Sequence, residues 1–212
     1  MRSSWRAASA VLIGCVLLSA CGGEEEPPRV TAQQQCDGAI APGAPAEALE
    51  KVLNTKRFSE AGRGWLTRTT EQITADYEAR ARWAKKSHRC KVGADPGPED
   101  LAINFGLYHP SDLLGEVRPR GMHPYEMGIE AHAGFVRSMI FVECVSPRLK
   151  GSGERPARIR GSLDVGRPEP ADTVAIREAN LTVLHSAALA VVRKLGCEND
   201  AGLPEKPVLK PK

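Results

Sequence analysis

The sequence predicts an α+β fold in which helices pack on one face of an antiparallel sheet of four to five strands. Three observations predict it. Apolar residues recur at helical spacing before residue 86, they alternate at period two between residues 101 and 165, and a long helical pattern closes the chain. Successive strands with no helix between them are most simply antiparallel neighbours. The expected order is helix, helix, strands and a long C-terminal helix, which is typical of helices packed on one side of a sheet.

Two helices are expected in the first third of the chain. The first covers residues 44–54, with Pro45 near its start and apolar residues at three and four residue spacing. The second covers residues 69–85, because Thr69 and Gln72 have the spacing of a capping box. Apolar residues continue the second helical stripe at Ile73, Tyr77, Ala81 and Ala84.

The strands are expected at residues 101–107, 127–133, 135–144 and 159–165. The first, second and fourth alternate apolar with other residues, as half-buried strands do. The run at 135–144 is apolar on both faces, which predicts a central strand. The segment at 111–124, between the first two, is rich in Gly and Pro and is expected to be an exposed loop.

The clearest element is a helix from Asp172 to Leu195. Asp172 is a suitable N-cap, cations lie in the last turn, and Gly196 suits the position after the helix. Its expected apolar stripe is Leu181, Leu184, Ala188, Val191 and Leu195. Residues 198–212 hold three prolines and several charges, so a disordered tail is expected there.

The first 20 residues have the three parts of an export signal. Arg2 and Arg6 form a cationic start, an apolar run follows from residue 7 to 18, and Ser19 and Ala20 are small. A membrane-spanning helix needs about 20 apolar residues, and this run is shorter. We therefore expect residues 1–20 to be a signal peptide that is removed.

The residues Leu17, Leu18, Ser19, Ala20 and Cys21 resemble the lipobox of bacterial lipoproteins. The resemblance implies a diacylglyceryl group on the Cys21 sulfur and cleavage just before Cys21. The mature chain would then sit on the extracytoplasmic face of the cell membrane, and acyl chains contribute about 0.8 kcal/mol per buried CH₂ to such anchoring. The alternative is an ordinary export signal in which Cys21 is incidental. Residues 21–35 are polar and rich in Gly, Glu, Pro and Gln, which predicts a flexible tether.

The rest of the chain also resembles the small cysteine-containing lipoproteins of actinobacteria. The resemblance lies in residues 36–38 (Cys-Asp-Gly) before a helix, in Arg57 and Phe58, and in a closing helix that ends in residues 195–197 (Leu-Gly-Cys). It supplies no catalytic residues to transfer to this chain.

Four cysteines fall inside the expected globular domain of residues 36–197: Cys36, Cys90, Cys144 and Cys197. An even number of cysteines in an oxidising compartment predicts two disulfides, and there is no C-x₂-C pair of the kind zinc sites use. Three pairings are possible. We favour Cys36 with Cys90, which flank the helical first third, and Cys144 with Cys197, which end a strand and the helix expected to pack on it.

Charge argues against nucleic acid as a partner. The chain has 29 basic and 26 acidic residues. Loss of Arg2 and Arg6 with the signal peptide leaves 27 against 26, so the mature chain is nearly neutral. Proteins that bind nucleic acid typically carry a clear excess of basic residues.

The best candidate site is a group of imidazoles and carboxylates between residues 109 and 132. Such groups are ligands for a zinc-like ion, and Glu130 and His132 would share one strand face. That face is the polar one, so solvent exposure explains it without a metal, and no tight ligand motif is present. The group consists of His109, Asp112, His123, Glu126, Glu130 and His132. No metal is expected, and the weak metal candidates among them are His123, Glu126, Glu130 and His132.

No motif for nucleophilic catalysis, phosphate binding or dinucleotide binding occurs. Ser152 lies between two glycines but lacks the strand and helix of a nucleophile elbow. We therefore expect a non-enzymatic domain, without a cofactor, that binds an envelope protein, an envelope component or a small ligand. A secreted hydrolase and a structural accessory subunit of an envelope complex are the alternatives.

Overall fold

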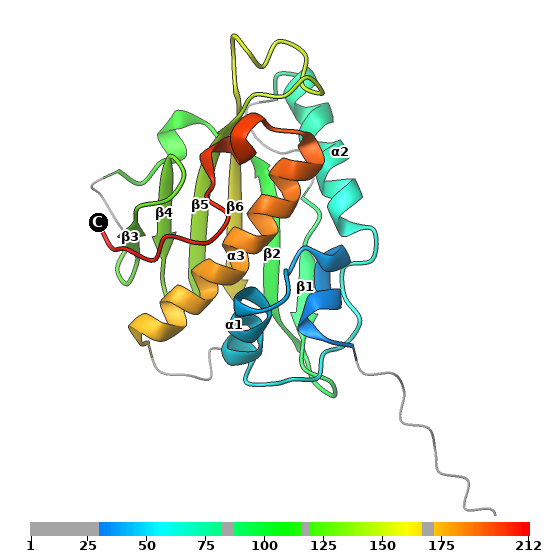
Figure 1. The fold of residues 1–212 in the computed structure, drawn as a ribbon, viewed down its shortest axis with the longest axis vertical. Coiled ribbons are helices and arrows are strands. Elements are labelled where there is room, and N and C mark those ends of the chain that lie inside the picture. The colour runs from blue at the N-terminus through cyan, green and yellow to red at the C-terminus, as the bar shows by residue number, and fades with distance from the viewer. Residues whose placement is uncertain (1–29, 82–86, 116–118, 167–171) are drawn as a thin grey trace, which may run out of the picture.

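The computed structural model describes residues 30–81, 87–115, 119–166 and 172–212. Its centre is one antiparallel sheet of six strands in the order β1-β2-β6-β5-β4-β3 (Figure 1). The strands are β1 (Cys90–Gly93), β2 (Glu99–Leu107), β3 (His123–Tyr125), β4 (Glu130–Ala133), β5 (Arg137–Cys144) and β6 (Ala157–Val165). The helices are α1 (Ala44–Leu53), α2 (Trp65–Glu78) and α3 (Val174–Leu195), with short 3₁₀ turns at η1 (Ala32–Gly38), η2 (Pro110–Asp112) and η3 (Glu198–Gly202).

The α+β class is confirmed, but the expected number of four to five strands is too low. The two additional strands are β1 and β3, which have only four and three residues. Segments this short cannot show an alternating pattern, so their pairing with β2 and β4 fixes them as strands. The segment expected as one strand at 127–133 is a strand only from Glu130 onward.

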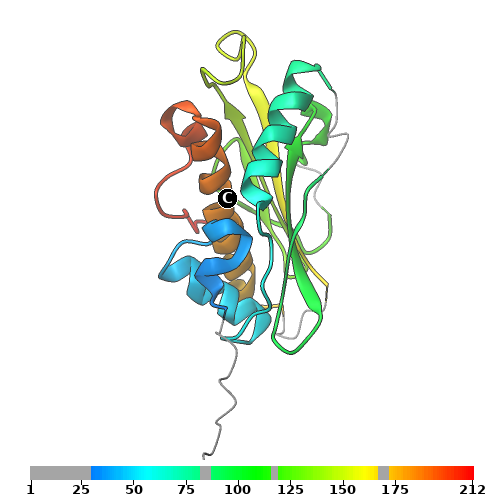
Figure 2. The ribbon, with the colours of Figure 1, turned by 90° about the vertical axis from the view of Figure 1, so that its right-hand side faces the viewer.

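The helices lie on one face of the sheet, which we call the inner face (Figures 1 and 2). The side chains of β2 alternate between buried and half-buried positions, and Leu101, Ile103 and Phe105 point inward. Helix α2 reaches the same face, because the rings of Trp65 and Phe105 lie 6.0 Å apart. The opposite face carries the other set of strand side chains, and we call it the outer face.

Helix α3 is buried on more than the single expected stripe, since 15 of its 22 residues are buried. It packs on the sheet and is flanked by α1 and α2. Its N-cap is Thr173, whose hydroxyl accepts a hydrogen bond from the Ile176 N–H, and not the expected Asp172, which pairs with Arg177. Gly196 follows the helix with a φ of 71°, as expected for the residue that ends it.

Helix α2 begins at Trp65, four residues before the expected start at Thr69. The capping group comes from a distant residue: the Asp37 carboxylate accepts hydrogen bonds from the N–H groups of Gly64 and Leu66, at 2.6 and 2.9 Å. An acidic side chain at this end of a helix also suits the helix dipole. The helix ends at Glu78, and part of the expected continuation to residue 85 lies outside the described residues.

The favoured cysteine pairing is confirmed. Cys36 and Cys90 form one disulfide and Cys144 and Cys197 the other, with Cα–Cα distances of 5.6 and 5.2 Å. The first joins η1 to β1, and the second joins the end of β5 to the residue after Gly196. Both disulfides therefore connect the helical layer to the sheet.

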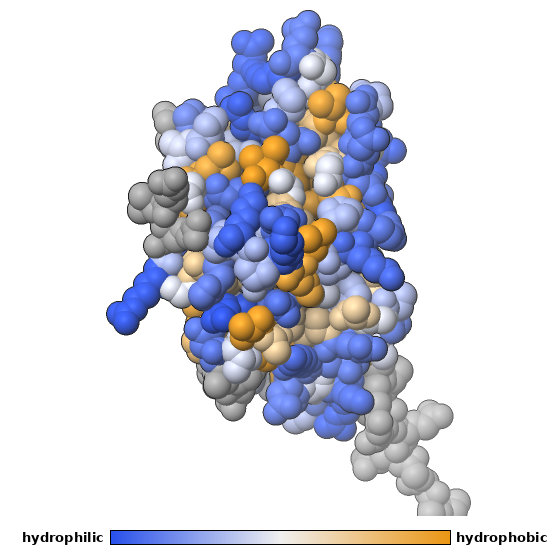
Figure 3. Space-filling model, turned by 60° about the vertical axis from the view of Figure 1, so that its left-hand side comes forward, coloured by the Kyte–Doolittle hydropathy of each residue, from blue (hydrophilic) through white to orange (hydrophobic). Residues whose placement is uncertain are grey.

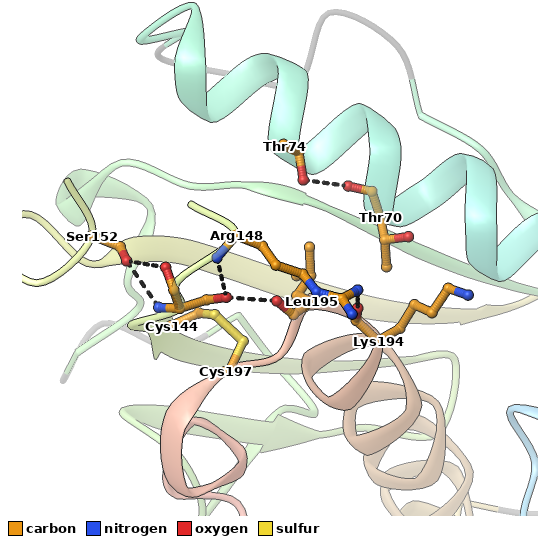
Figure 4. The surroundings of a disulfide bond; sticks show 9 residues. Thr70, Thr74, Cys144, Arg148, Ser152, Lys194, Leu195 and Cys197 are labelled. Atoms are coloured by element: carbon orange, nitrogen blue, oxygen red, sulfur yellow. Dashed lines mark hydrogen bonds between the residues drawn. A yellow bond between two sulfur atoms is a disulfide. The ribbon is translucent and has the colours of Figure 1, made fainter. Parts of the chain in front are cut away.

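A network of hydrogen bonds surrounds the Cys144–Cys197 disulfide (Figure 4). The Arg148 guanidinium donates to the Lys194 carbonyl at 2.8 Å, and the Ser146 hydroxyl donates to the Leu195 carbonyl at 2.6 Å. Carbonyls in the last turn of a helix have no partner within the helix. These two bonds satisfy them and fasten the end of α3 to the loop after β5.

Both ends of the globular domain extend further than expected. Residues 198–212 are not a disordered tail: the chain runs back to the edge strand β3, where Tyr125 and Pro211 form an antiparallel bridge. Glu126 and Lys210 reinforce this contact through a backbone hydrogen bond and an ion pair of 3.0 Å. At the other end, Val30 bridges Phe58, so the ordered chain includes residues 30–35 of the expected tether.

One cluster of buried apolar residues extends from Ala32 to Leu203. None of the helices in the described part of the chain has the length and apolar character required to cross a membrane. Cys21 and the expected signal peptide at residues 1–20 lie outside the described residues.

Replacing Cys144 and Cys197 together by Ala should lower the free energy of unfolding by about 2 to 4 kcal/mol, because the disulfide restricts the unfolded chain. Urea denaturation followed by circular dichroism measures the loss. The matched variant replaces Cys36 and Cys90, whose sequence separation of 54 is close to the 53 of the first pair. Loop-closure entropy therefore predicts similar losses, and an unchanged denaturation midpoint in either variant would contradict the structural role of that bridge.

Candidate functional site

The imidazoles and carboxylates expected to form a cluster are separated in the structure. His109 contacts its own loop through Ser111, and Asp112 accepts a hydrogen bond from the His109 N–H. Glu126 pairs with Lys210, and His123 is exposed. Within the ranges that the structure describes, no three His, Cys, Asp or Glu side chains converge in a way that could hold a metal ion.

Only Glu130 and His132 come together. They share the outer face of β4, and a Glu130 carboxylate oxygen lies 2.7 Å from His132 Nε2. The expectation that solvent surrounds this pair is wrong for His132, which is only 1% exposed. The carboxylate of Glu130 also accepts hydrogen bonds from the N–H groups of Leu114 and Gly115, at 2.7 and 3.2 Å. The pair therefore fixes the loop after η2 to the outer face.

These contacts keep Glu130 ionised. Burial raises the pKa of the Glu130 carboxyl, but the hydrogen bonds from Leu114, Gly115 and His132 outweigh burial and bring the pKa below its ordinary value of 4.5. Tyr108 lies nearby, with its ring 5.1 Å from that of Phe141. Burial and the negative charges of Glu143 and Glu130 raise the pKa of Tyr108 to about 12. The hydrogen bonds of Glu130 to His132, Leu114 and Gly115 therefore hold the loop at residues 114–115.

The same outer face also carries an open cavity, with a volume of about 650 Å³. Its floor is one row of residues across four neighbouring strands: Lys91 pairs with Ala102, Ala102 with Asp164, and Asp164 with Arg137. Met139, two residues along β5, also lines the cavity and is the register partner of His132. The cavity is therefore built on four neighbouring strands of the sheet, from the edge strand β1 to β5, and adjoins the Glu130 and His132 pair.

A turn at residues 119–122 forms one wall of this cavity, where Pro119, Arg120 and Met122 line it. The turn is closed by a hydrogen bond from the Met122 N–H to the Pro119 carbonyl, at 3.1 Å. It packs closely on Gly134, because a Cβ atom at Gly134 would lie 2.9 Å from the Met122 sulfur and 2.9 Å from the Gly121 oxygen. Only glycine at position 134 permits this approach.

The segment that includes Gly134 is in turn fixed by helix α3. The buried Asn180 amide donates hydrogen bonds to the carbonyls of Gly134 and Phe135, at 3.0 and 3.1 Å. Val136 follows directly, is 47% exposed and lines the cavity. The helical layer therefore positions one wall of a cavity on the far side of the sheet.

Two ion pairs occupy part of the cavity. Lys91 pairs with Glu99 at 2.9 Å, and Arg137 pairs with Asp164 at 2.5 Å. A third acid, Asp100, is also engaged. The other two cations, Arg89 and Arg120, have no acidic partner among the residues that the structure describes. The lining is therefore a mixture of apolar surface, neutralised pairs and two uncompensated guanidinium groups.

The described lining of this cavity consists of charged and apolar side chains and glycine. The described residues around the cavity include no hydroxyl, thiol or imidazole side chain. A nucleophile with an adjacent base, which acyl transfer requires, is thus not assembled from them. The cavity residues were not among the expected site residues, because they come from five separate segments and share no sequence motif.

A second hollow lies between α2 and the end of α3, beside the disulfide in Figure 4. It is lined in part by Thr70, Thr74, Arg148 and Lys194. Thr70 and Thr74 donate their hydroxyl hydrogens to backbone carbonyls of α2, and Arg148 is bound to the end of α3. Since these groups already serve the fold, the outer-face cavity is the better candidate for a ligand.

Replacing Glu130 by Gln should lower the free energy of unfolding by about 1 to 3 kcal/mol near pH 7, because a buried charged acceptor is lost. Because the pKa of Glu130 is lowered in the folded state, its ionised carboxylate stabilises the fold at pH values above 4.5. This stabilisation is lost as the pH falls through the folded-state pKa. The difference between wild type and variant, measured by urea denaturation, should therefore shrink well below pH 4.5.

The matched control is Glu143→Gln, on the outer face of β5, where the carboxylate pairs with the exposed Arg158. Its expected effect is about 0 to 1 kcal/mol. Equal losses for the two variants, or a loss at Glu130 that does not depend on pH, would show that Glu130 does not hold the loop.

No protein-family model, curated protein or solved structure gives a significant match to this chain. What the domain does has therefore to follow from its own residues and their geometry.

Proposed function

We propose that this chain is a bacterial lipoprotein, anchored by lipid on Cys21 to the extracytoplasmic face of the cell membrane, and that its domain binds a small ligand in the outer-face cavity. The observation that carries the anchor is the lipobox at residues 17–21, which ends directly before the polar segment leading into the ordered domain.

The cysteines support an extracytoplasmic location. All four cysteines of the domain are paired, and stable disulfides are typical of oxidising compartments outside the cytoplasm. The two cysteines outside the pairs are Cys15, in the signal peptide, and Cys21. Cys21 is therefore the one cysteine of the proposed mature chain that lies outside the two disulfides of the described residues.

The distance between anchor and domain is short. Only residues 22–29 separate Cys21 from Val30, the first described residue. A fully extended chain spans at most about 3.6 Å per residue, so this segment reaches no further than about 30 Å. A ligand-binding domain on such a segment would work close to the membrane surface.

Binding is favoured over the alternative of a hydrolase by the chemistry of the cavity. It lies on the sheet, has a volume typical of small-molecule sites and combines apolar with charged side chains. In the described part of the chain, the Glu130 and His132 pair adjoins the cavity through Met139, and this pair is engaged in holding the 114–115 loop. On the face shown in Figure 3, apolar side chains form separate small patches, which gives no support there to a large protein interface.

Replacing Cys21 by Ser should abolish incorporation of a fatty-acid analogue and either release the protein into the medium or leave it uncleaved, because the acceptor thiol is missing. Metabolic labelling of cells that express each variant, followed by gel analysis of membrane and medium fractions, measures both effects.

The control is Cys15→Ser, which alters a cysteine that leaves with the signal peptide and should keep full labelling. Labelling that persists in the Cys21 variant, or that is lost in the Cys15 variant alone, would contradict the assignment of the anchor.

A further inference from the structure

The charge balance of the outer-face cavity indicates what kind of ligand it takes. Among the residues that the structure describes, four cationic and three acidic side chains line it. Two cations are neutralised by Glu99 and Asp164, and the third acid, Asp100, is already engaged. Arg89 and Arg120 remain without an acidic partner in the described parts of the chain. Guanidinium groups bind carboxylate and phosphate oxygens through paired hydrogen bonds, so an anionic group fits this lining.

The same cavity offers apolar surface that the fold does not cover. Val136 is 47% exposed, and Met122 and Met139 are half-buried on two sides of the cavity. Methionine side chains adapt to ligands of irregular shape. An apolar chain lying on these three residues would remove their exposed surface from water, which is favourable in proportion to the area covered.

The volume limits the size of the ligand. About 650 Å³ lies within the range of roughly 300 to 1,000 Å³ that is typical of small-molecule sites. The cavity is open, and its floor is the continuous row from Lys91 to Arg137 across the sheet. A ligand would therefore lie along the sheet, with its charged end at Arg89 or Arg120.

We infer that the cavity binds a small amphipathic anion, meaning a single apolar chain or ring with one carboxylate or phosphate group. This inference rests on the proposed binding function and specifies its ligand class. The guanidinium group of Arg89 or of Arg120 binds the anionic group, and Met122, Val136 and Met139 bind the apolar part.

Calorimetric titration of the Cys21→Ser mature chain tests this ligand class, since Cys21 lies outside the described domain. The probes are decanoate, decanol and decylammonium, which share one chain and differ in charge. Decanoate should bind roughly tenfold to a hundredfold more tightly than decanol, and decylammonium should bind most weakly. Added salt should weaken decanoate binding and leave decanol binding nearly unchanged.

Two sets of variants locate the binding site. The double variant Arg89→Gln and Arg120→Gln should reduce the affinity for decanoate to that for decanol, whereas the control Arg63→Gln, at an exposed arginine outside the cavity, should leave it unchanged. Ala102→Trp, which fills the cavity floor, should weaken binding of both decanoate and decanol. Circular dichroism of each variant confirms that it is folded.

The possible outcomes separate this inference from the function on which it rests. If decanol and decanoate bind equally well and Ala102→Trp abolishes the binding, the anionic ligand class is overturned. The proposed binding function would still stand. Arginine-dependent binding to phosphatidylglycerol vesicles in the absence of decanoate binding would assign the charge to a bilayer headgroup and overturn the small-ligand inference. Failure of the wild-type chain to bind any probe would overturn both the ligand class and the binding function.

Discussion

The burial of helix α3 against the inner face of the sheet is the constraint on which the rest of the structure depends. The helix is buried on most of its circumference, and α1, α2 and the C-terminal segment complete its cover. A sheet face occupied in this way has no room for a ligand. Polar and charged strand residues must then lie on the opposite face, where the cavity and the Glu130 and His132 pair are found. The location of the site therefore follows from the packing of one helix.

The same helix connects the core to the site. Its last turn is fastened to β5 by the Cys144–Cys197 disulfide and by Arg148, and its first half holds Gly134 and Phe135 through Asn180. On the far side of the helix, His185 Nε2 contacts the Pro204 carbonyl at 2.9 Å, and burial lowers the pKa of His185, which favours the neutral imidazole as donor. Helix α3 therefore contacts the core, the C-terminal segment and the segment that forms one cavity wall. These contacts would present a largely preformed surface to a ligand.

The parts of the fold that could be predicted are those with a strong local pattern. The C-terminal helix, three of the four expected strands and the first helix follow from the period of their apolar residues, and the cysteine pairing follows from where the elements end. The parts that could not be predicted depend on partners distant in sequence. Asp37 caps the start of α2 through a hydrogen bond to Gly64, which lies 27 residues later in the sequence. The short strands β1 and β3 depend on pairing with β2 and β4, and the C-terminal segment depends on its bridge to Tyr125. At the site, His132 is buried by a loop whose position the pattern of apolar residues does not predict. The cavity is formed by segments that are separate in the sequence and share no motif.

The proposed anchor would decide where this cavity operates, because it would hold the start of the ordered domain within about 30 Å of a membrane surface. Mass spectrometry of the amino-terminal tryptic peptide from the mature protein, residues 21–29, measures the anchor directly. The proposed function predicts a chain that begins at Cys21 and carries the mass of a diacylglyceryl group on that residue. A mature chain that begins at another residue, or an unmodified Cys21, would contradict it.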